Sequence, residues 1–165
     1  MVFIQIIVLI LLVYIIYLLL YSMIGGAPYA ALSHNRIVTM YKLLKPKKGR
    51  RFLDLGSGDG RVVKYFAKKG VDSYGIEINP LIYVVSKFNT RGIKKSHIKL
   101  GDYWGEDFSK YDYISLWVVP HTMPRLEKKL KKELKKGSLV VSNHLQFKKW
   151  KYEVGENDVY LYRKN

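Results

Sequence analysis

Cysteine is absent from the 165-residue sequence, so the chain can form neither disulfide bonds nor thiolate metal sites. The four histidines are scattered without ligand-like spacing, and we therefore expect no metal site. The sequence also lacks internal repeats, and its length leaves room for one globular domain. Charge of either sign is missing from the first 35 residues, because the first basic residue is Arg36 and the first acidic residue is Asp54.

Residues 1–24 are uncharged, and Gln5 is their only strongly polar residue. As a helix this segment would be about 36 Å long, more than the roughly 30 Å of a bilayer's hydrocarbon core. We therefore expect a retained transmembrane anchor. A cleaved signal peptide, the alternative, would start with positive charge and have a shorter apolar stretch. Because basic residues follow the segment and none precedes it, we expect a single-pass membrane protein whose residues 25–165 are cytoplasmic.

The rest of the chain is strongly basic, with 29 Lys and Arg residues against 13 Asp and Glu residues, a net charge of +16. Such a charge attracts an anionic partner, which can be a phospholipid surface, nucleic acid or an acidic protein. Beside the expected anchor, a lipid surface is the simplest partner for this basic face. The stretch KKLKKELKKG at 128–137 is either the solvated face of an amphipathic helix or a contact with acidic lipids or substrate.

Strand and helix patterns alternate along the basic part of the chain. Apolar runs predict strands at 50–56, 72–78, 97–101, 112–119 and 138–144, and a closing hairpin at 150–154 and 158–162. Helical spacing predicts helices at 60–69, 79–91 and 121–136, and a polar connection at 103–110. This order predicts an α/β fold, namely the Rossmann-like, seven-stranded fold of class I methyltransferases. We expect an anchor at 1–24, a hinge and N-terminal helix at 25–50, and the methyltransferase domain at 51–165.

The stretch DLGSGDG at 54–60 joins the first expected strand to a helix. Ligands of open α/β sheets bind at this junction, where glycines allow positive φ and a close approach to the backbone. A dinucleotide fingerprint would read G-x-G-x-x-G, whereas these glycines alternate and a carboxylate ends the strand. A negative side chain suits the cationic ammonium and sulfonium of S-adenosylmethionine, so we expect that cofactor, with NAD as the alternative.

Acidic residues lie at or just after the ends of three successive expected strands, at Asp54, Glu77 and Asp102. Glu77 is placed to accept hydrogen bonds from the two ribose hydroxyls of the cofactor. Asp102 follows the next strand and is placed to accept one from the adenine amino group. Three acids at neighbouring strand ends are a more specific signal than the glycines alone. The alternative is that these carboxylates only cap helices and turns.

The chain resembles the small, membrane-anchored protein-lysine methyltransferases, which include the enzymes that modify the ATP synthase c subunit and the adenine nucleotide translocase, and archaeal relatives. The segments that carry the resemblance are PYAAL at 28–32, DLGSGDGRVV at 54–63, GIEINP at 75–80 and VVPHTMPRLEKKL at 118–130. The resemblance implies that Pro28-Tyr29 lies over the cofactor near the substrate opening. It also implies that the methionine end of the cofactor is held by Asp54, Gly56, Ser57, Gly58 and Gly60, the ribose by Glu77 and the adenine by Asp102.

An acceptor lysine must be neutral to attack a methyl group, and its ordinary pKa near 10.4 makes that form rare at pH 7. Desolvation at the mouth of a pocket would enrich the neutral form. We expect this pocket at the end of the fourth strand, with Tyr29, Pro120 and His121 as the candidate catalytic residues. His121 could accept a proton or only shape the pocket, and Tyr29 could be only a pocket wall.

The sequence therefore predicts an S-adenosylmethionine-dependent protein-lysine N-methyltransferase that acts on a membrane or membrane-proximal protein. We expect it to contact the membrane through its N-terminal helix and basic face, with its catalytic domain cytoplasmic. The alternatives are an RNA methyltransferase, a small-molecule or lipid methyltransferase, and a membrane-tethered scaffold that only binds the cofactor. Nucleic acid is not the expected partner, because Val-Val-Pro-His at 118–121 replaces the Asn/Asp-Pro-Pro-aromatic pocket of base-modifying enzymes.

Overall fold

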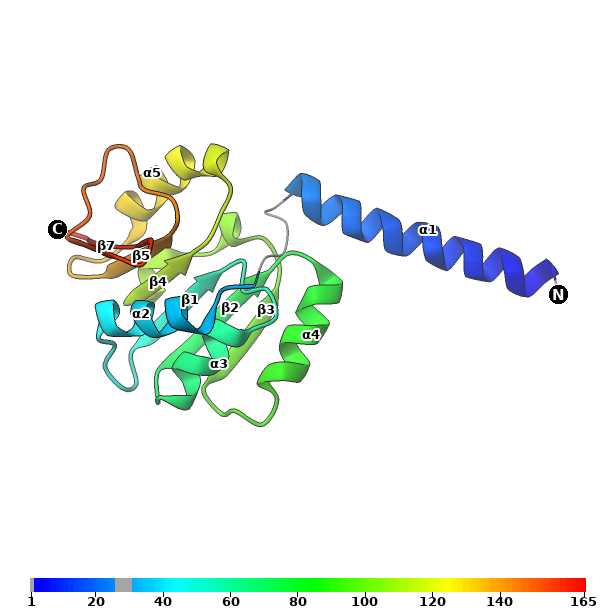
Figure 1. Ribbon diagram of the computed structural model, residues 1–165, viewed down its shortest axis with the longest axis horizontal. Helices are drawn as coiled ribbons and strands as arrows, with labels where there is room; N and C mark the ends of the chain where they lie inside the picture. The colour runs from blue at the N-terminus through cyan, green and yellow to red at the C-terminus, as the bar shows by residue number, and fades with distance from the viewer. Residues whose placement is uncertain (1, 26–30) are drawn as a thin grey trace.

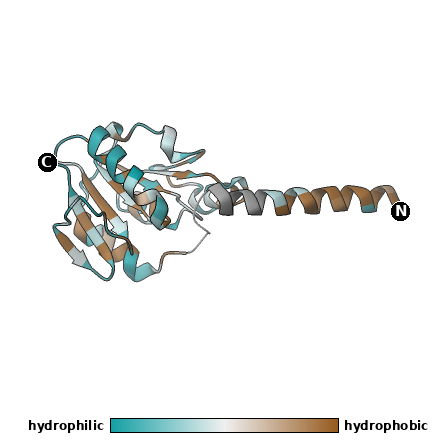
Figure 2. Cartoon of the chain, turned by 90° about the horizontal axis from the view of Figure 1, so that it is seen from above, coloured by the Kyte–Doolittle hydropathy of each residue, from teal (hydrophilic) through white to brown (hydrophobic). Residues whose placement is uncertain are grey.

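The computed structural model describes the backbone of residues 2–25 and 31–165 and the side chains of residues 2–17 and 31–165. Helix α1 (Val2–Gly25) extends away from the sheet, and its outer part is coloured as hydrophobic (Figures 1 and 2). Over these described residues, no helix is both long and apolar enough to cross a membrane.

This finding contradicts the expected transmembrane anchor at 1–24 and, with it, the expected location as a single-pass membrane protein with a cytoplasmic catalytic domain. The expected hinge lies partly at 26–30, outside the described residues.

A seven-stranded sheet forms the centre of the molecule, in the order β3-β2-β1-β4-β5-β7-β6. The strands are β1 (Arg51–Leu55), β2 (Asp72–Glu77), β3 (Ser96–Leu100), β4 (Tyr113–Leu116), β5 (Leu139–Asn143), β6 (Val154–Glu156) and β7 (Val159–Arg163). The strands β1 to β5 run parallel, and β7 pairs antiparallel with both β5 and β6. The expected seven-stranded class I methyltransferase layout, with an antiparallel finish, is confirmed.

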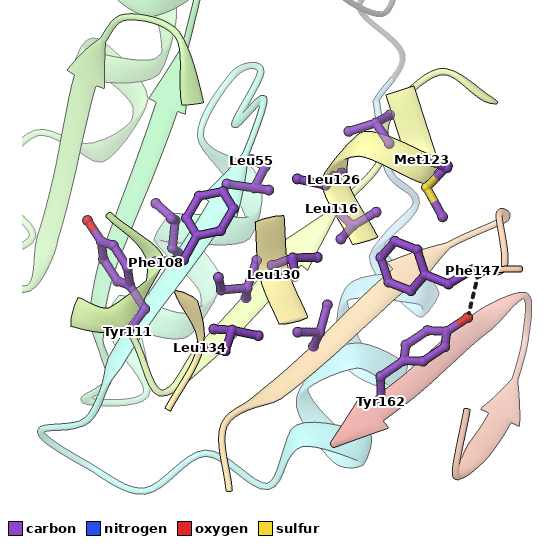
Figure 3. Close-up of a cluster of buried hydrophobic side chains, with 14 of the residues drawn as sticks. Leu55, Phe108, Tyr111, Leu116, Met123, Leu126, Leu130, Leu134, Phe147 and Tyr162 are labelled. Carbon is purple, nitrogen blue, oxygen red and sulfur yellow. Dashed lines mark hydrogen bonds between the residues drawn. The ribbon is translucent and has the colours of Figure 1, made fainter. Parts of the chain in front are cut away.

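Helices cover both faces of this sheet (Figure 1). One face is covered by α2 (His34–Leu44), α3 (Arg61–Lys68) and α4 (Pro80–Thr90). The other face packs against α5 (Met123–Glu133), whose Leu126 and Leu130 meet Leu55 and Leu116 of the sheet (Figure 3). Central strands therefore bury both of their faces, which explains why they read as apolar runs.

The connection at 103–110 contains two short 3-10 helices, η1 (Tyr103–Gly105) and η2 (Phe108–Lys110). Strand β4 ends at Leu116 rather than at residue 119, where Leu116 is paired with Leu55, the last residue of β1, and with Ser142 of β5. A further 3-10 helix, η3 (Pro120–Thr122), precedes α5, so that helix is shorter than expected.

The closing hairpin is shifted from the expected position, because β6 begins at Val154 instead of residue 150. Trp150 packs its ring against Phe147 and Tyr162, with centroids 5.6 and 5.4 Å away. Its indole N–H donates to the backbone oxygen of Arg163 at 3.3 Å. These contacts hold residue 150 against the core as part of a loop.

Candidate active site

The loop after β1 is built from glycines with left-handed backbone, with φ of 71° at Gly56, 55° at Gly58 and 80° at Gly60. The backbone N–H groups of Gly56 and Ser57 both donate to the carbonyl of Ile76 in β2, at 3.0 and 2.9 Å. A Cβ at residue 60 would collide with a serine side chain of α4, so only glycine fits there. The loop is thereby held tightly against β2 and α4.

Glu77 connects this loop to the end of β2. Its Oε2 accepts the backbone N–H of Gly58 at 2.9 Å, and its Oε1 accepts that of Asn79 at 2.9 Å. The side chain is buried, and each carboxylate oxygen keeps a lone pair for a further donor. Glu77 can therefore order the glycine loop and accept hydrogen bonds from a ligand at the same time.

Asp54 is the residue before the last in β1 and is only 5% exposed. The hydroxyl of Ser115 in β4 donates a hydrogen bond to its carboxylate. Burial, with added repulsion from Glu77 and Asp59, raises the pKa of Asp54 to about 7, although the bond from Ser115 lowers it. Within the described part of the chain Asp54 forms no ion pair, so a cationic ligand would relieve the cost of its burial.

Asp102 lies at the corresponding end of β3. The backbone N–H of Gly101 donates to the carbonyl of Glu77 at 2.9 Å, which joins the ends of β2 and β3. The Asp102 side chain is exposed and accepts the backbone N–H of Trp104 at 3.0 Å, so it caps η1. The structure thus places the three acids at neighbouring strand ends, while Asp102 also has the capping contact of the alternative interpretation.

The candidate catalytic residues differ in how they are placed. Pro120 and His121 follow β4 in η3, and neither is buried at this carboxyl end of the sheet. Tyr29 lies outside the described residues. The structure therefore brings Pro120 and His121 to the expected edge of the sheet.

An ion pair that the sequence reasoning missed fixes the far end of the glycine loop. The guanidinium of Arg61 contacts the Asp59 carboxylate, with Nη2 to Oδ2 at 2.8 Å. The same guanidinium donates from Nη1 to the backbone oxygen of Leu32 at 3.0 Å. The only signal in the sequence is the i, i+2 spacing of these two charges in the DGR triplet, and such a spacing alone does not indicate a contact with residue 32.

A hollow of about 320 Å³ lies on the helix side of the glycine loop. Leu32, Asp59, Arg61 and Asn89 are among its lining residues, whereas Asp54, Glu77 and Asp102 are not. This hollow therefore lies apart from the row of acids at the strand ends.

Comparisons with known proteins identify the family of this chain. Residues 54–154 match the family model of the ANTKMT methyltransferase domain. The lysine N-methyltransferase of the ATP synthase c subunit from Xenopus laevis is 33% identical over 126 residues, which cover 74% of this chain and 55% of that protein. A protein-lysine N-methyltransferase of Saccharolobus islandicus is 27% identical over 157 residues, covering 86% of this chain and 96% of that protein. The chain thus spans about half the length of the ATP synthase methyltransferases that it matches.

Among solved structures, an RNA methyltransferase from Salinibacter ruber in complex with S-adenosyl-L-homocysteine has a TM-score of 0.74 and 25% identity. The match covers 82% of this chain and 92% of that one. The resemblance drawn from the sequence motifs is confirmed by the family model and by the curated relatives. The chain belongs to the ANTKMT methyltransferase domain family.

Proposed function

We propose that this protein is an S-adenosylmethionine-dependent protein-lysine N-methyltransferase. The observation that carries the proposal is Asp54, a buried carboxylate at the glycine loop whose pKa is raised to about 7 and which has no ion-pair partner among the described residues. A cofactor with a cationic ammonium and sulfonium supplies the missing charge there. A pyrophosphate would add repulsion at the same place.

The proposed cofactor residues follow the order of the strands. Gly56, Ser57, Gly58 and Gly60 would hold the methionine end together with Asp54. Glu77 would accept from the ribose hydroxyls and Asp102 from the adenine amino group. When bound, the cofactor supplies the methyl group and a good leaving group, so alignment of the acceptor and exclusion of water are left to the protein.

The acceptor would enter at the carboxyl end of β4. Pro120 and His121 would shape its pocket there, with Tyr29 as a wall above it. A lysine is the proposed nucleophile, because curated relatives include lysine methyltransferases of the ATP synthase c subunit and of the adenine nucleotide translocase. A translocase works within a membrane, which supports a membrane or membrane-proximal target here.

Transfer of label from tritiated S-adenosylmethionine tests the proposal. Purified full-length protein is mixed with membrane extract, and the products are hydrolysed and separated into amino acids and nucleosides. We expect label in methyl-lysine, and we expect Glu77→Ala and Gly58→Arg to abolish it. Glu156→Ala, which changes an exposed acid of β6, is the matched control and keeps full activity. Methyl-lysine formation by either loop variant at the normal rate would refute the assignment.

RNA methylation is the second candidate, favoured by the Salinibacter ruber enzyme and by the net charge of +16. The same labelling experiment separates the two functions. Label in nucleosides rather than in methyl-lysine would replace the lysine assignment with this one.

A further inference from the structure

The end of β5 contains a buried amide with an unused acceptor. Asn143 is 1% exposed, and its Nδ2 donates to the backbone oxygen of Leu116, the last residue of β4, at 3.2 Å. A carbonyl can only accept, so the amide must turn its NH2 group toward Leu116 and its Oδ1 away. That Oδ1 has no hydrogen-bond partner among the described residues. An unpaired buried acceptor costs about 1–3 kcal/mol, so its presence calls for a donor that binds there.

The backbone immediately after Asn143 is strained. His144 has φ of 66°, and the N–H of Leu145 donates across it to the carbonyl of Asn143 at 2.8 Å. This is a γ-turn of the rarer, positive-φ kind. Two further contacts hold it: the His144 N–H donates to the Asp158 carbonyl at 2.8 Å, and the Ser142 hydroxyl donates to the Leu145 carbonyl at 2.5 Å. Strain that is held so firmly is typical of functional sites.

Asn143 and Asp54 lie on the same face of the sheet. Residues two apart in a strand point to the same face, so Asp54 shares a face with Phe52 in β1 and Asn143 shares one with Val141 in β5. Phe52 and Val141 pack in one hydrophobic cluster, so these faces are the same face of the sheet. Strand β4 lies between them, with Ser115 paired to Asp54 in register. At about 4.8 Å per strand, the tip of β5 is about 10 Å from that of β1. A methionine end held at β1 would thus direct its methyl group toward β4, with Asn143 on the far side.

The neighbours of Asn143 suit a lysine side chain. Trp117, just beyond the end of β4, is half-buried and lies 6.3 Å from the His144 ring, so apolar surface is available for the methylene chain. Asp158, an exposed carboxylate, lies 3.6 Å from His144 Nδ1 beside the same turn. Arg36 shares that carboxylate, with Nη2 to Oδ2 at 3.1 Å.

We propose that Asn143 is a catalytic residue that orients the acceptor, its Oδ1 accepting one N–H of the neutral lysine amine so that the lone pair faces the methyl group. This inference rests on the proposed lysine methyltransferase function. A neutral amide oxygen does not favour the protonated amine as a carboxylate would. The neutral amine has two N–H groups, the monomethylated amine has one, and the dimethylated amine has none. The hydrogen bond can therefore assist the first two transfers and not the third.

Kinetics of full-length Asn143→Leu test this inference. The substrate is a synthetic peptide around the lysine labelled in the extract, prepared in unmodified, monomethylated and dimethylated forms. We expect kcat to fall about tenfold on the first two forms and to stay within about twofold on the third. Affinity for S-adenosylmethionine, measured by calorimetry, should be essentially unchanged. Glu156→Ala, which changes an exposed acid of β6 outside this turn, is the control and leaves kcat essentially unchanged on all forms.

Three results would overturn the inference: unchanged kcat on the unmodified peptide, an equal fall on all three forms, or about tenfold weaker cofactor binding, which would assign Oδ1 to the cofactor. If Asn143→Leu fails to unfold cooperatively in urea, Asn143→Ala makes the same comparison with a smaller side chain. Failure of the proposed function itself is distinguishable, because the unsubstituted protein would then form no methyl-lysine at all.

Discussion

The replacement of Asp54 by asparagine gives a direct test of the electrostatics at the glycine loop. The pKa of this carboxyl is about 7 in the folded protein, against an ordinary value of 3.8. Between these two pH values the folded state keeps a proton that the unfolded chain releases. Stability must therefore fall as pH rises through this window, because the folded state binds more protons than the unfolded one. A pKa difference of about 3 between the two states corresponds to about 4 kcal/mol.

Urea unfolding of the unsubstituted protein and of Asp54→Asn, measured between about pH 4 and pH 8, provides the assay. We expect the free energy of unfolding of the unsubstituted protein, relative to the variant, to drop by about 4 kcal/mol across this range and to level off above about pH 7. When the two free energies of unfolding are subtracted at each pH, the contributions of groups that titrate in both proteins cancel. Asp107→Asn is the control. Side-chain and backbone hydrogen bonds from Ser109 lower the pKa of this exposed carboxyl, so the replacement of Asp107 should not remove the fall in stability with rising pH. Parallel pH profiles for the unsubstituted protein and Asp54→Asn would refute the reasoning.

Three further substitutions probe the same contacts. Ser115→Ala removes the hydrogen bond that lowers the pKa of Asp54, so the pH at which stability levels off should move upward in the same urea series; a downward move would contradict this. Gly60→Ala forces a side chain into a backbone with φ of 80°, and we expect a loss of about 2 kcal/mol or more by urea unfolding, with an unchanged midpoint as the opposing result. Tyr162→Phe leaves the buried N–H of Phe147 without its 3.1 Å acceptor, which should cost about 1–3 kcal/mol, and an equally stable variant would show that another group accepts there.

The central strands are predictable from the sequence because both of their faces are covered. Phe52 and Leu53 point to opposite sides of β1, and neither has any exposed surface. An apolar residue is therefore needed at nearly every position, and the resulting continuous apolar run predicts a buried strand. Asp54 and Glu77 can be recognised for a similar reason, because a carboxylate near the end of a buried strand stands out from its apolar neighbours.

Contacts between residues far apart in the sequence cannot be predicted from such local patterns. The shifted hairpin depends on how Trp150 packs against Tyr162, and strand propensity favours Trp150 in a strand. Likewise, the strained turn at His144 is held by Asp158, fourteen positions later. The N-terminal segment shows the opposite error, in which hydropathy alone predicts a membrane span that the described residues do not support.

The two contacts of Arg61 couple the glycine loop to the segment that precedes α2. One guanidinium holds both the Asp59 carboxylate of the glycine loop and the chain at Leu32. Any molecule that tightens the loop must therefore also steady the segment leading into α2. If the proposed cofactor tightens this loop, then by thermodynamic reciprocity a protein that binds that segment would strengthen cofactor binding by the same factor. Under the proposed function, cofactor and target would then each raise the affinity of the protein for the other, which would favour a ternary complex.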